Sequence, residues 1–177
     1  MTKLHPTHSR RARGVEVLAL LCALALASTA FALSTGDRAP AVKGPRLDGK
    51  GELSLEAQRG KVVYLDFWAS WCKPCAVSLP ALDAFRKEFG EKDFAVLAVN
   101  VDQDPAKART FLSLRPVGYP SLNDPKGLLP VQFGVETMPT SFLIDRHGVI
   151  RQVHRGFRKE DIPELRAAIQ ELIRNGR

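Results

Sequence analysis

The chain has 177 residues, of which 45% are hydrophobic and 25% charged, a composition typical of one soluble globular domain with a short appendage. The formal net charge is +7, but residues 1–32 contribute three arginines, one lysine and one glutamate, which leaves +4 on the remainder. No basic stripe interleaved with aromatic residues accompanies this modest charge, so we expect no nucleic-acid partner.

The first 32 residues have the pattern of a secretory signal peptide. Three arginines precede an apolar run over residues 17–29, and Ala30-Phe31-Ala32 supplies the small–x–small cleavage pattern. We therefore divide the chain into a signal peptide, residues 1–32, and a folded domain, residues 33–177. The alternative is an uncleaved membrane anchor, for which the apolar run is barely long enough. In both cases the domain is exported, and we expect it in the periplasm, free or anchored to the inner membrane.

The first half of the domain predicts a hairpin, a buried strand and a helix. Residues 34–60 are rich in Gly, Pro and charge and favour a small β-hairpin, with Asp48-Gly49 as its turn. Residues 62–68 are almost continuously apolar, as in a strand of a sheet that is covered on both faces. Apolar residues at helical spacing follow Cys72, in a helix that contains Pro80.

The second half predicts a strand, two helices, a hairpin and a terminal helix. Residues 94–101 form another apolar strand, and Asp104-Pro105 is a helix start with a capping residue and proline at the first position. The remaining elements are a turn at 124–127, a short helix at 128–133, a hairpin of 141–145 with 149–153, and a helix at 160–173. This order predicts an α/β fold in which helices cover a mixed sheet.

Two cysteines of the domain, Cys72 and Cys75, are spaced as CxxC between the apolar strand and the helix that follows it. Free backbone N–H groups and the dipole at a helix N-terminus stabilise a thiolate, and a cysteine three residues away can close a disulfide. Cys22 lies in the signal segment, so the domain has no further cysteine for a structural disulfide framework. A CxxC beside a βαβ pattern is a thioredoxin-like redox motif.

The chain resembles the thioredoxin superfamily, and within it the exported TlpA/ResA-like thiol–disulfide oxidoreductases. The resemblance covers roughly residues 36–174. One matching block is residues 67–75 with Leu79-Pro80, and the predicted N-terminal hairpin is another. A further block consists of Gly134-Val135, Met138-Pro139-Thr140 and 142–145 with Gly148. It implies a thioredoxin-like three-layer sandwich, with a mixed central sheet, helices on both faces and an N-terminal β-hairpin.

The resemblance also implies roles for the residues of the motif. Cys72 would be the exposed attacking cysteine and Cys75 the more buried resolving one, while Pro139 would be a cis-proline that lets Met138 present its backbone to an extended substrate. Asp66 matches the buried acid of thioredoxin, where burial raises the pKa and suits the group to accept a proton from Cys75. The alternative for Asp66 is a structural residue paired with a lysine.

The residues around the cysteines have both functional and structural interpretations. We expect Trp71, Lys73 and Pro74 at the substrate-binding surface, with Trp71 shielding the sulfur from water and Trp68 packed in the core. A cation at Lys73 would favour the reduced form and raise the redox potential, unless it is only a solvated residue at the rim of the site.

These features favour an enzyme that reduces disulfides of exported proteins through the Cys72–Cys75 dithiol. The sequence has no NADPH or flavin motif, so we expect no cofactor beyond this disulfide and a membrane-embedded electron donor. The resemblance implies substrates such as apocytochrome c or the copper-site cysteines of an oxidase assembly factor. We expect a monomer, because no dimerisation arm is visible.

Two other functions use the same cysteines. An exported oxidase or isomerase would run the chemistry in the other direction, and only the redox potential separates it from a reductase. A copper-binding module could hold Cu(I), a soft ion, between the two thiolates. Zinc would need two more ligands, but His147 and His154 lack the usual spacing, and we expect a turn residue and a surface strand residue there. We therefore expect no metal site.

Overall fold

A computed structural model describes residues 33–176 of the chain. The predicted signal peptide, residues 1–32, lies outside the described residues, so its cleavage stays a prediction. No helix among residues 33–176 combines the length and the apolar character needed to cross a membrane.

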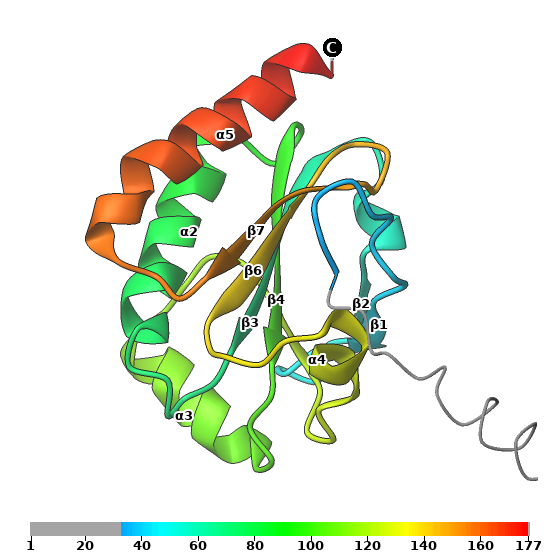
Figure 1. The fold of residues 1–177 in the computed structure, drawn as a ribbon. Coiled ribbons are helices and arrows are strands. Elements are labelled where there is room, and N and C mark those ends of the chain that lie inside the picture. Colours follow the sequence, from blue (N-terminus) through cyan, green and yellow to red (C-terminus); the bar gives the residue numbers. More distant parts are fainter. Residues whose placement is uncertain (1–32, 177) are drawn as a thin grey trace, which may run out of the picture. The chain divides into compact units, whose positions relative to one another are not determined.

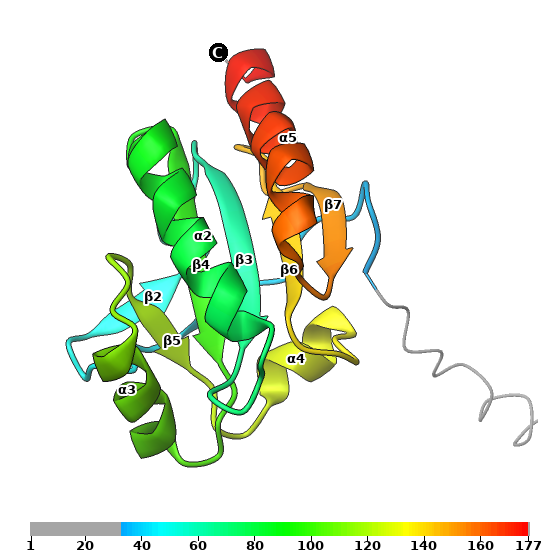
Figure 2. The same ribbon diagram turned by 90° about the vertical axis from the view of Figure 1, so that its left-hand side faces the viewer.

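The centre of the domain is a mixed sheet with the strand order β5-β4-β3-β6-β7. β3, β4 and β5 run parallel, β6 is antiparallel to β3, and β7 is antiparallel to β6. The strands are β3 (Val62–Trp68), β4 (Phe94–Asn100), β5 (Ser121–Asn123), β6 (Thr140–Ile144) and β7 (Ile150–Arg155). Figure 1 labels all of these strands except β5, which is labelled in Figure 2. Every residue of β3 is buried, as the apolar run predicted for a sheet covered on both faces.

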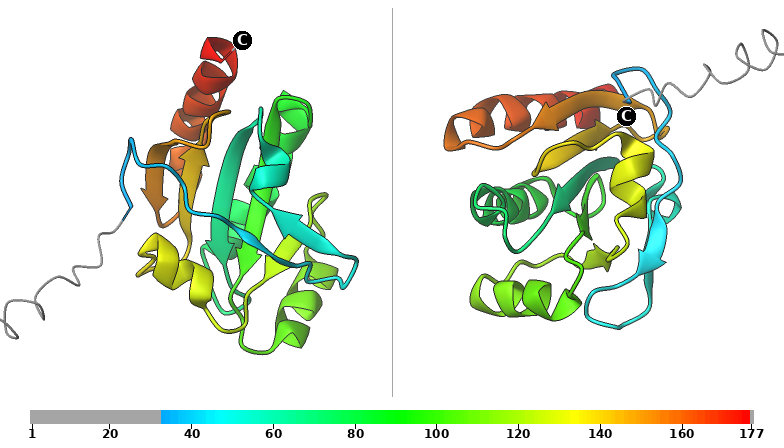
Figure 3. Two further views of the ribbon diagram at one scale, coloured as in Figure 1. Left: turned by 90° about the vertical axis from the view of Figure 1, so that its right-hand side faces the viewer. Right: turned by 60° about the horizontal axis from the view of Figure 1, so that its bottom comes forward.

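Helices cover both faces of this sheet, which confirms the three-layer sandwich. The helices are α2 (Cys75–Phe89), α3 (Pro105–Leu114), α4 (Leu128–Phe133) and α5 (Ile162–Asn175), with 3-10 turns η1 (Glu56–Gln58) and η2 (Lys159–Asp161). One apolar cluster joins α2, α3 and α5 to the face of β3 that carries Tyr64 and Trp68. A second cluster joins α4 to the opposite face, which carries Leu65 and Phe67. Figure 2 shows the three longer helices in front of the sheet, and the right-hand view of Figure 3 shows the layers.

The N-terminal hairpin forms as predicted, from β1 (Lys43–Pro45) and β2 (Glu52–Ser54), which pair antiparallel. Its turn contains Asp48-Gly49, and the Gly49 N–H donates to the carbonyl of Arg46 over 3.0 Å. The hairpin lies against β5, because Arg46 bridges to Leu122. β5 was not predicted from the sequence: it is a three-residue strand that pairs with β4 on one side and bridges to Arg46 on the other.

Local capping signals set the ends of the other helices close to their predicted positions. The Asp104 carboxylate accepts a hydrogen bond from the Ala106 N–H over 2.9 Å and caps α3. α4 spans the predicted residues 128–133 and ends at Gly134, whose φ of 64° favours glycine. α2 continues through Pro80.

Candidate active site

The register of the sheet brings three segments together at the carboxyl end of β3. β3 ends at Trp68, and the Cys72–Cys75 loop leads from there into α2. β6 runs antiparallel to β3 with Thr140 opposite Phe67, so Pro139 lies next to the end of β3. β4 is parallel to β3, with Asn100 opposite Trp68, so the segment after Asn100 reaches the same edge.

Cys72 and Cys75 form a disulfide, with 2.09 Å between the sulfur atoms and 5.3 Å between the Cα atoms. The backbone N–H of Cys75, at the start of α2, donates to Cys72 Sγ over 3.2 Å. This donor and the helix N-terminus lower the energy of negative charge on Cys72, which is the sulfur predicted to attack. The prediction that Cys72 is exposed is wrong for the disulfide form, because only 4% of its surface is accessible, while Cys75 is fully buried.

Asp66 is fully buried on the face of β3 that packs against α2. It lies between Tyr64 and Trp68 along this face, and both belong to the same apolar cluster as Cys75. The Ser141 hydroxyl donates to Asp66 Oδ1 over 2.7 Å, and Oδ2 has no hydrogen-bond partner among the described residues. Burial raises the pKa of Asp66 to about 7, although the hydrogen bond from Ser141 acts in the opposite direction. The partner of Asp66 is therefore a hydroxyl and not the lysine of the structural alternative.

The loop before β6 contains the predicted cis-proline, because the Met138–Pro139 peptide bond is cis. Pro139 is buried and Met138 is half-buried. The Gly156 N–H donates to the Pro139 carbonyl over 2.7 Å, and the Thr140 hydroxyl donates to the Thr137 carbonyl over 2.8 Å. These two bonds fix the loop from both sides.

The other residues predicted at the substrate surface lie on the outside of the CxxC loop. Trp71 is 65% exposed, and Lys73 and Pro74 are exposed as well. Trp68 is fully buried, as predicted, and its Nε1 donates to the Ser121 hydroxyl over 2.9 Å. Trp71 therefore offers a large apolar surface beside the disulfide.

A buried hydrogen-bond group that the sequence analysis missed holds the start of the CxxC loop. Asp102 accepts from the backbone N–H of Ser70 over 2.9 Å, from the Ser70 hydroxyl over 2.8 Å and from Asn100 Nδ2 over 2.8 Å. Asp102 and Asn100 are both buried. The sequence feature that could have indicated this group is the pair of polar residues at the end of an apolar strand, in Asn100-Val101-Asp102.

The two histidines of the described domain lie in different environments. His147 is an exposed turn residue between β6 and β7, as predicted. His154 lies in a strand at the edge of the sheet, as predicted, but it is only partly exposed: 20% of its side chain is accessible, and Nε2 lies 3.3 Å from Asp161 Oδ2. No group of three or more His, Cys, Asp or Glu side chains placed to hold a metal occurs among residues 33–176.

Comparison with known proteins identifies the family of this chain. The Redoxin family model matches residues 34–169. The chain belongs to the Redoxin family. It is 35% identical to the thioredoxin-like protein YneN of Bacillus subtilis, over 70% of this chain and 73% of that protein. It is 32% identical to the thiol-disulfide oxidoreductase ResA of Geobacillus thermodenitrificans, over 86% of this chain and 91% of ResA.

A solved structure supports both the fold and the chemistry. A crystal structure assigned to a thiol:disulfide interchange protein DsbE from Chlorobium tepidum has a TM-score of 0.76 and 42% sequence identity, and covers 80% of this chain and 99% of that protein. The chain is thus a TlpA/ResA-like member of the thioredoxin superfamily and an enzyme of the thiol–disulfide oxidoreductase class.

Proposed function

We propose that this enzyme works in the periplasm as a reductase of disulfides in exported proteins. The signal-like residues 1–32 support export, and the absence of other cysteines from the domain sequence leaves Cys72 and Cys75 free for exchange chemistry. A membrane-embedded donor supplies the electrons. By family resemblance, the substrates are apocytochrome c or the copper-site cysteines of an oxidase assembly factor.

The reaction follows from the order of the two cysteines. The Cys72 thiolate attacks one sulfur of the substrate disulfide, and the other substrate sulfur leaves as a thiolate. Cys75 loses its proton to Asp66 and attacks Cys72 Sγ, which closes the enzyme disulfide and frees the second substrate sulfur. The substrate lies against Met138 and Pro139.

The observation that carries the direction of the reaction is the fully buried carboxyl of Asp66. It lies on the face of β3 whose residues Tyr64 and Trp68 pack in one cluster with Cys75. A carboxylate near the sulfurs disfavours a thiolate there by like-charge repulsion. Because the dithiol form is the one that carries the thiolate, this repulsion favours the disulfide and makes the dithiol a stronger reductant.

Exposed groups at the rim complete the proposed substrate surface. Trp71 supplies apolar contact area, Pro74 keeps the loop rigid, and Lys73 supplies a positive charge. Lys73 opposes the effect of Asp66 on the potential, but its charge is exposed and is screened by salt. It is the feature that favours the second candidate, an exported oxidase or isomerase.

A redox titration of the full chain in detergent, against thiol/disulfide buffers, tests this proposal. Trp68 and Trp71 are its only tryptophans, and their fluorescence reports the state of the nearby sulfurs. We expect a two-electron midpoint nearer to that of thioredoxin, about −270 mV, than to that of DsbA, about −120 mV. A midpoint above about −180 mV would assign an oxidant or isomerase instead.

A further inference from the structure

A row of polar residues crosses the sheet from Asp66 to the surface beside α5. Asp66, Ser141 and His154 occupy directly opposed positions on β3, β6 and β7. Opposed residues in neighbouring antiparallel strands point to the same face, with Cβ atoms about 5 Å apart. This face is the one covered by α2 and α5, since Tyr64 and Leu143 belong to the apolar cluster there.

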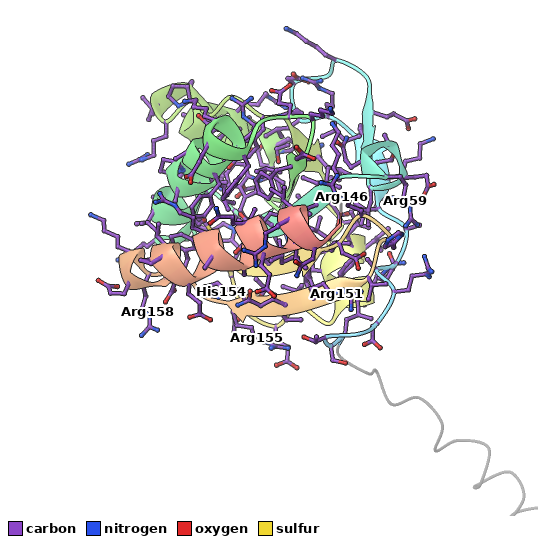
Figure 4. All side chains as sticks on the ribbon, turned by 90° about the horizontal axis from the view of Figure 1, so that it is seen from above. Arg59, Arg146, Arg151, His154, Arg155 and Arg158 are labelled. Carbon is purple, nitrogen blue, oxygen red and sulfur yellow. A yellow bond between two sulfur atoms is a disulfide. The ribbon has the colours of Figure 1, made fainter. Side chains whose placement is uncertain are left out.

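The outer end of this row is a close contact between His154 and Asp161 at the edge of the domain. His154 Nε2 lies 3.3 Å from Asp161 Oδ2, and the side chains are 20% and 14% exposed. Asp161 ends η2, directly before α5, and accepts from the backbone N–H of Arg158 over 2.8 Å. Figure 4 shows His154 between β7 and α5, with Arg155 and Arg158 near it at the same edge.

Tyr64 precedes Asp66 by two residues on β3, so its side chain points to the same face of the sheet as the row. Burial, followed by the negative charge of Asp66, raises the pKa of Tyr64, and the charge of Asp161 acts in the same direction. Both carboxylates thus act on the Tyr64 hydroxyl, which stays protonated at neutral pH. The charged or titratable groups around the row come from several elements. They are Tyr64 and Asp66 from β3, Cys75 from α2, Tyr119 from the segment before β5, His154 from β7, and Asp161 with Arg158 from the η2 segment.

The atoms of the row have unused hydrogen-bonding capacity. Asp66 Oδ2 and the Tyr64 hydroxyl are buried without a hydrogen-bond partner among the described residues, and His154 Nε2 faces Asp161 without hydrogen-bond geometry. Most buried polar groups are paired, so several such atoms along one line are unusual in a structure. Carboxyl, hydroxyl and imidazole groups can all accept one proton and release another.

The proposed reaction requires a path for a proton from the buried site to the solvent. The proton that leaves Cys75 goes to Asp66, and both residues are fully buried, so neither can exchange this proton directly with water. We propose that the row of Asp66, Ser141, Tyr64, His154 and Asp161, here called the proton row, carries that proton to the solvent. This inference rests on the proposed function, because it extends the role of Asp66.

Ionised Asp66 accepts a hydrogen bond from Ser141, and once it is protonated the direction of this bond reverses. The Ser141 oxygen then takes the proton from Asp66, and its own hydroxyl proton moves outward through the Tyr64 hydroxyl to His154. Asp161 attracts the positive charge that arises on His154, which releases the proton to water. No electron moves in this step, because the electron pairs are exchanged among the three sulfurs.

The test isolates the resolving step with 5,5′-dithiobis(2-nitrobenzoic acid). The full chain in detergent carries Cys22→Ser in every variant, so that only Cys72 and Cys75 react. The first thionitrobenzoate is released when Cys72 attacks the reagent, and the second when Cys75 displaces the mixed disulfide. We expect His154→Gln to slow the second release about tenfold near pH 7 and to leave the first unchanged. This factor is smaller than the roughly 100-fold or greater effect of removing a direct general base.

The matched control is His147→Gln, because His147 is an exposed turn histidine remote from the row in the sheet register. This variant should leave both phases and their pH profiles unchanged. Imidazole added to the buffer should restore most of the lost rate in His154→Ala, which a purely structural role of His154 would not allow. Should His154→Ala fail to fold, Asp161→Asn should show the same selective slowing of the second phase.

The variant Asp66→Asn shows whether a negative result refutes only the proton row or also the role of Asp66 in the proposed function. If Asp66→Asn leaves the second phase unchanged, Asp66 is not the base and both proposals about it are wrong. If Asp66→Asn slows the second phase but His154→Gln does not, the proton leaves by another route and only the proton row is refuted. Equal slowing of both phases by His154→Gln, without imidazole rescue, would assign His154 a packing role and also overturn the inference.

Discussion

Asp66 and Asp102 are both buried carboxyls next to the redox loop, but their hydrogen-bond environments differ. Asp102 accepts from three donors on Ser70 and Asn100. Asp66 accepts only from Ser141, and its second oxygen has no partner among the described residues. Three donors match the needs of a buried carboxylate, so Asp102 is suited to hold the loop in one geometry.

This comparison shows that burial alone does not make an acid reactive. Burial disfavours the charged form of Asp66, and its single donor offsets only part of this cost. Asp66 has too few donors, so its pKa lies at about 7, where a group can accept a proton and release it again. Asp102 therefore positions the loop, and Asp66 is the candidate for proton transfer.

The largest expected effect is on the pH dependence of stability, through Asp66. Its pKa is raised on folding, so its stabilising contribution is complete below about pH 4 and is lost as the pH rises through about 7. We expect the free energy of unfolding of the oxidised chain to fall by up to about 4 kcal/mol over this interval because of Asp66. In Asp66→Asn this part of the fall should disappear, as measured by urea unfolding at several pH values.

Asp102→Asn is the control for this experiment, because it changes a buried acid of the same loop region without touching Asp66. It should keep the fall in stability between pH 4 and pH 7, whatever its stability at a single pH. The same slope in Asp66→Asn as in the parent chain would show that Asp66 does not titrate in this interval, and the contrast between the two acids would not hold.

The next largest effect is a loss of stability in Asp102→Ala. The substitution leaves the Asn100 amide and the Ser70 N–H buried or half-buried without their acceptor. Unpaired buried donors each cost about 1–3 kcal/mol, so we expect the free energy of unfolding to fall by about 3 kcal/mol at pH 7. Gln103→Ala, at the exposed neighbouring position, should change it by less than about 0.5 kcal/mol. Similar small losses in both variants would mean that Asp102 does not hold the loop.

The parts of the fold that sequence could predict are those set by local signals. The Asp104 cap, the short helix ended by Gly134 and the buried run of β3 all lie within single segments of the chain. β5 was missed because its three residues have no periodicity of their own, and pairing with β4 and with the hairpin at Arg46 holds them in place. Such a strand is defined by tertiary contacts, which no short window of sequence contains.

The same distinction applies to the site. Cys72, Cys75 and the Met138–Pro139 bond belong to compact motifs, and the structure shows the disulfide between the two cysteines and the cis form of the bond. The position of Ser141 beside Asp66 follows from the β3–β6 register, which the sequence alone does not contain. The position of His154 likewise follows from the β6–β7 register, and its partner Asp161 lies in a separate segment. The exposure of Cys72 was predicted wrongly for a related reason, since side chains from distant parts of the chain cover a residue in a folded protein.

Ser141→Ala removes the hydroxyl that donates to Asp66, the single hydrogen-bond donor to this carboxyl among residues 33–176. A donor to a carboxylate favours the charged form, so its loss should move the pKa of Asp66 further up. We expect the fall in stability to continue above pH 7, with a loss of about 2 kcal/mol at pH 8 and a smaller loss below pH 5, where the bond between Ser141 and protonated Asp66 is neutral. Ser78→Ala is the control, because this buried serine lies in α2 and its hydroxyl bonds to the Cys75 carbonyl. It should lower stability equally at all pH values, and the same behaviour in Ser141→Ala would contradict the link to Asp66.

Ser70→Ala tests the other acid with the smallest expected effect. The substitution removes the hydroxyl that donates to Asp102 Oδ1 but keeps the backbone N–H that donates to Oδ2. Asp102 retains two of its three donors, and Ser70 is only half-buried, so we expect a loss of about 1 kcal/mol. This loss should not vary between pH 5 and pH 8 in urea unfolding, in contrast to that of Ser141→Ala. A loss that grew with pH, as at Ser141, would show that the two acids behave alike and that donor number does not separate their roles.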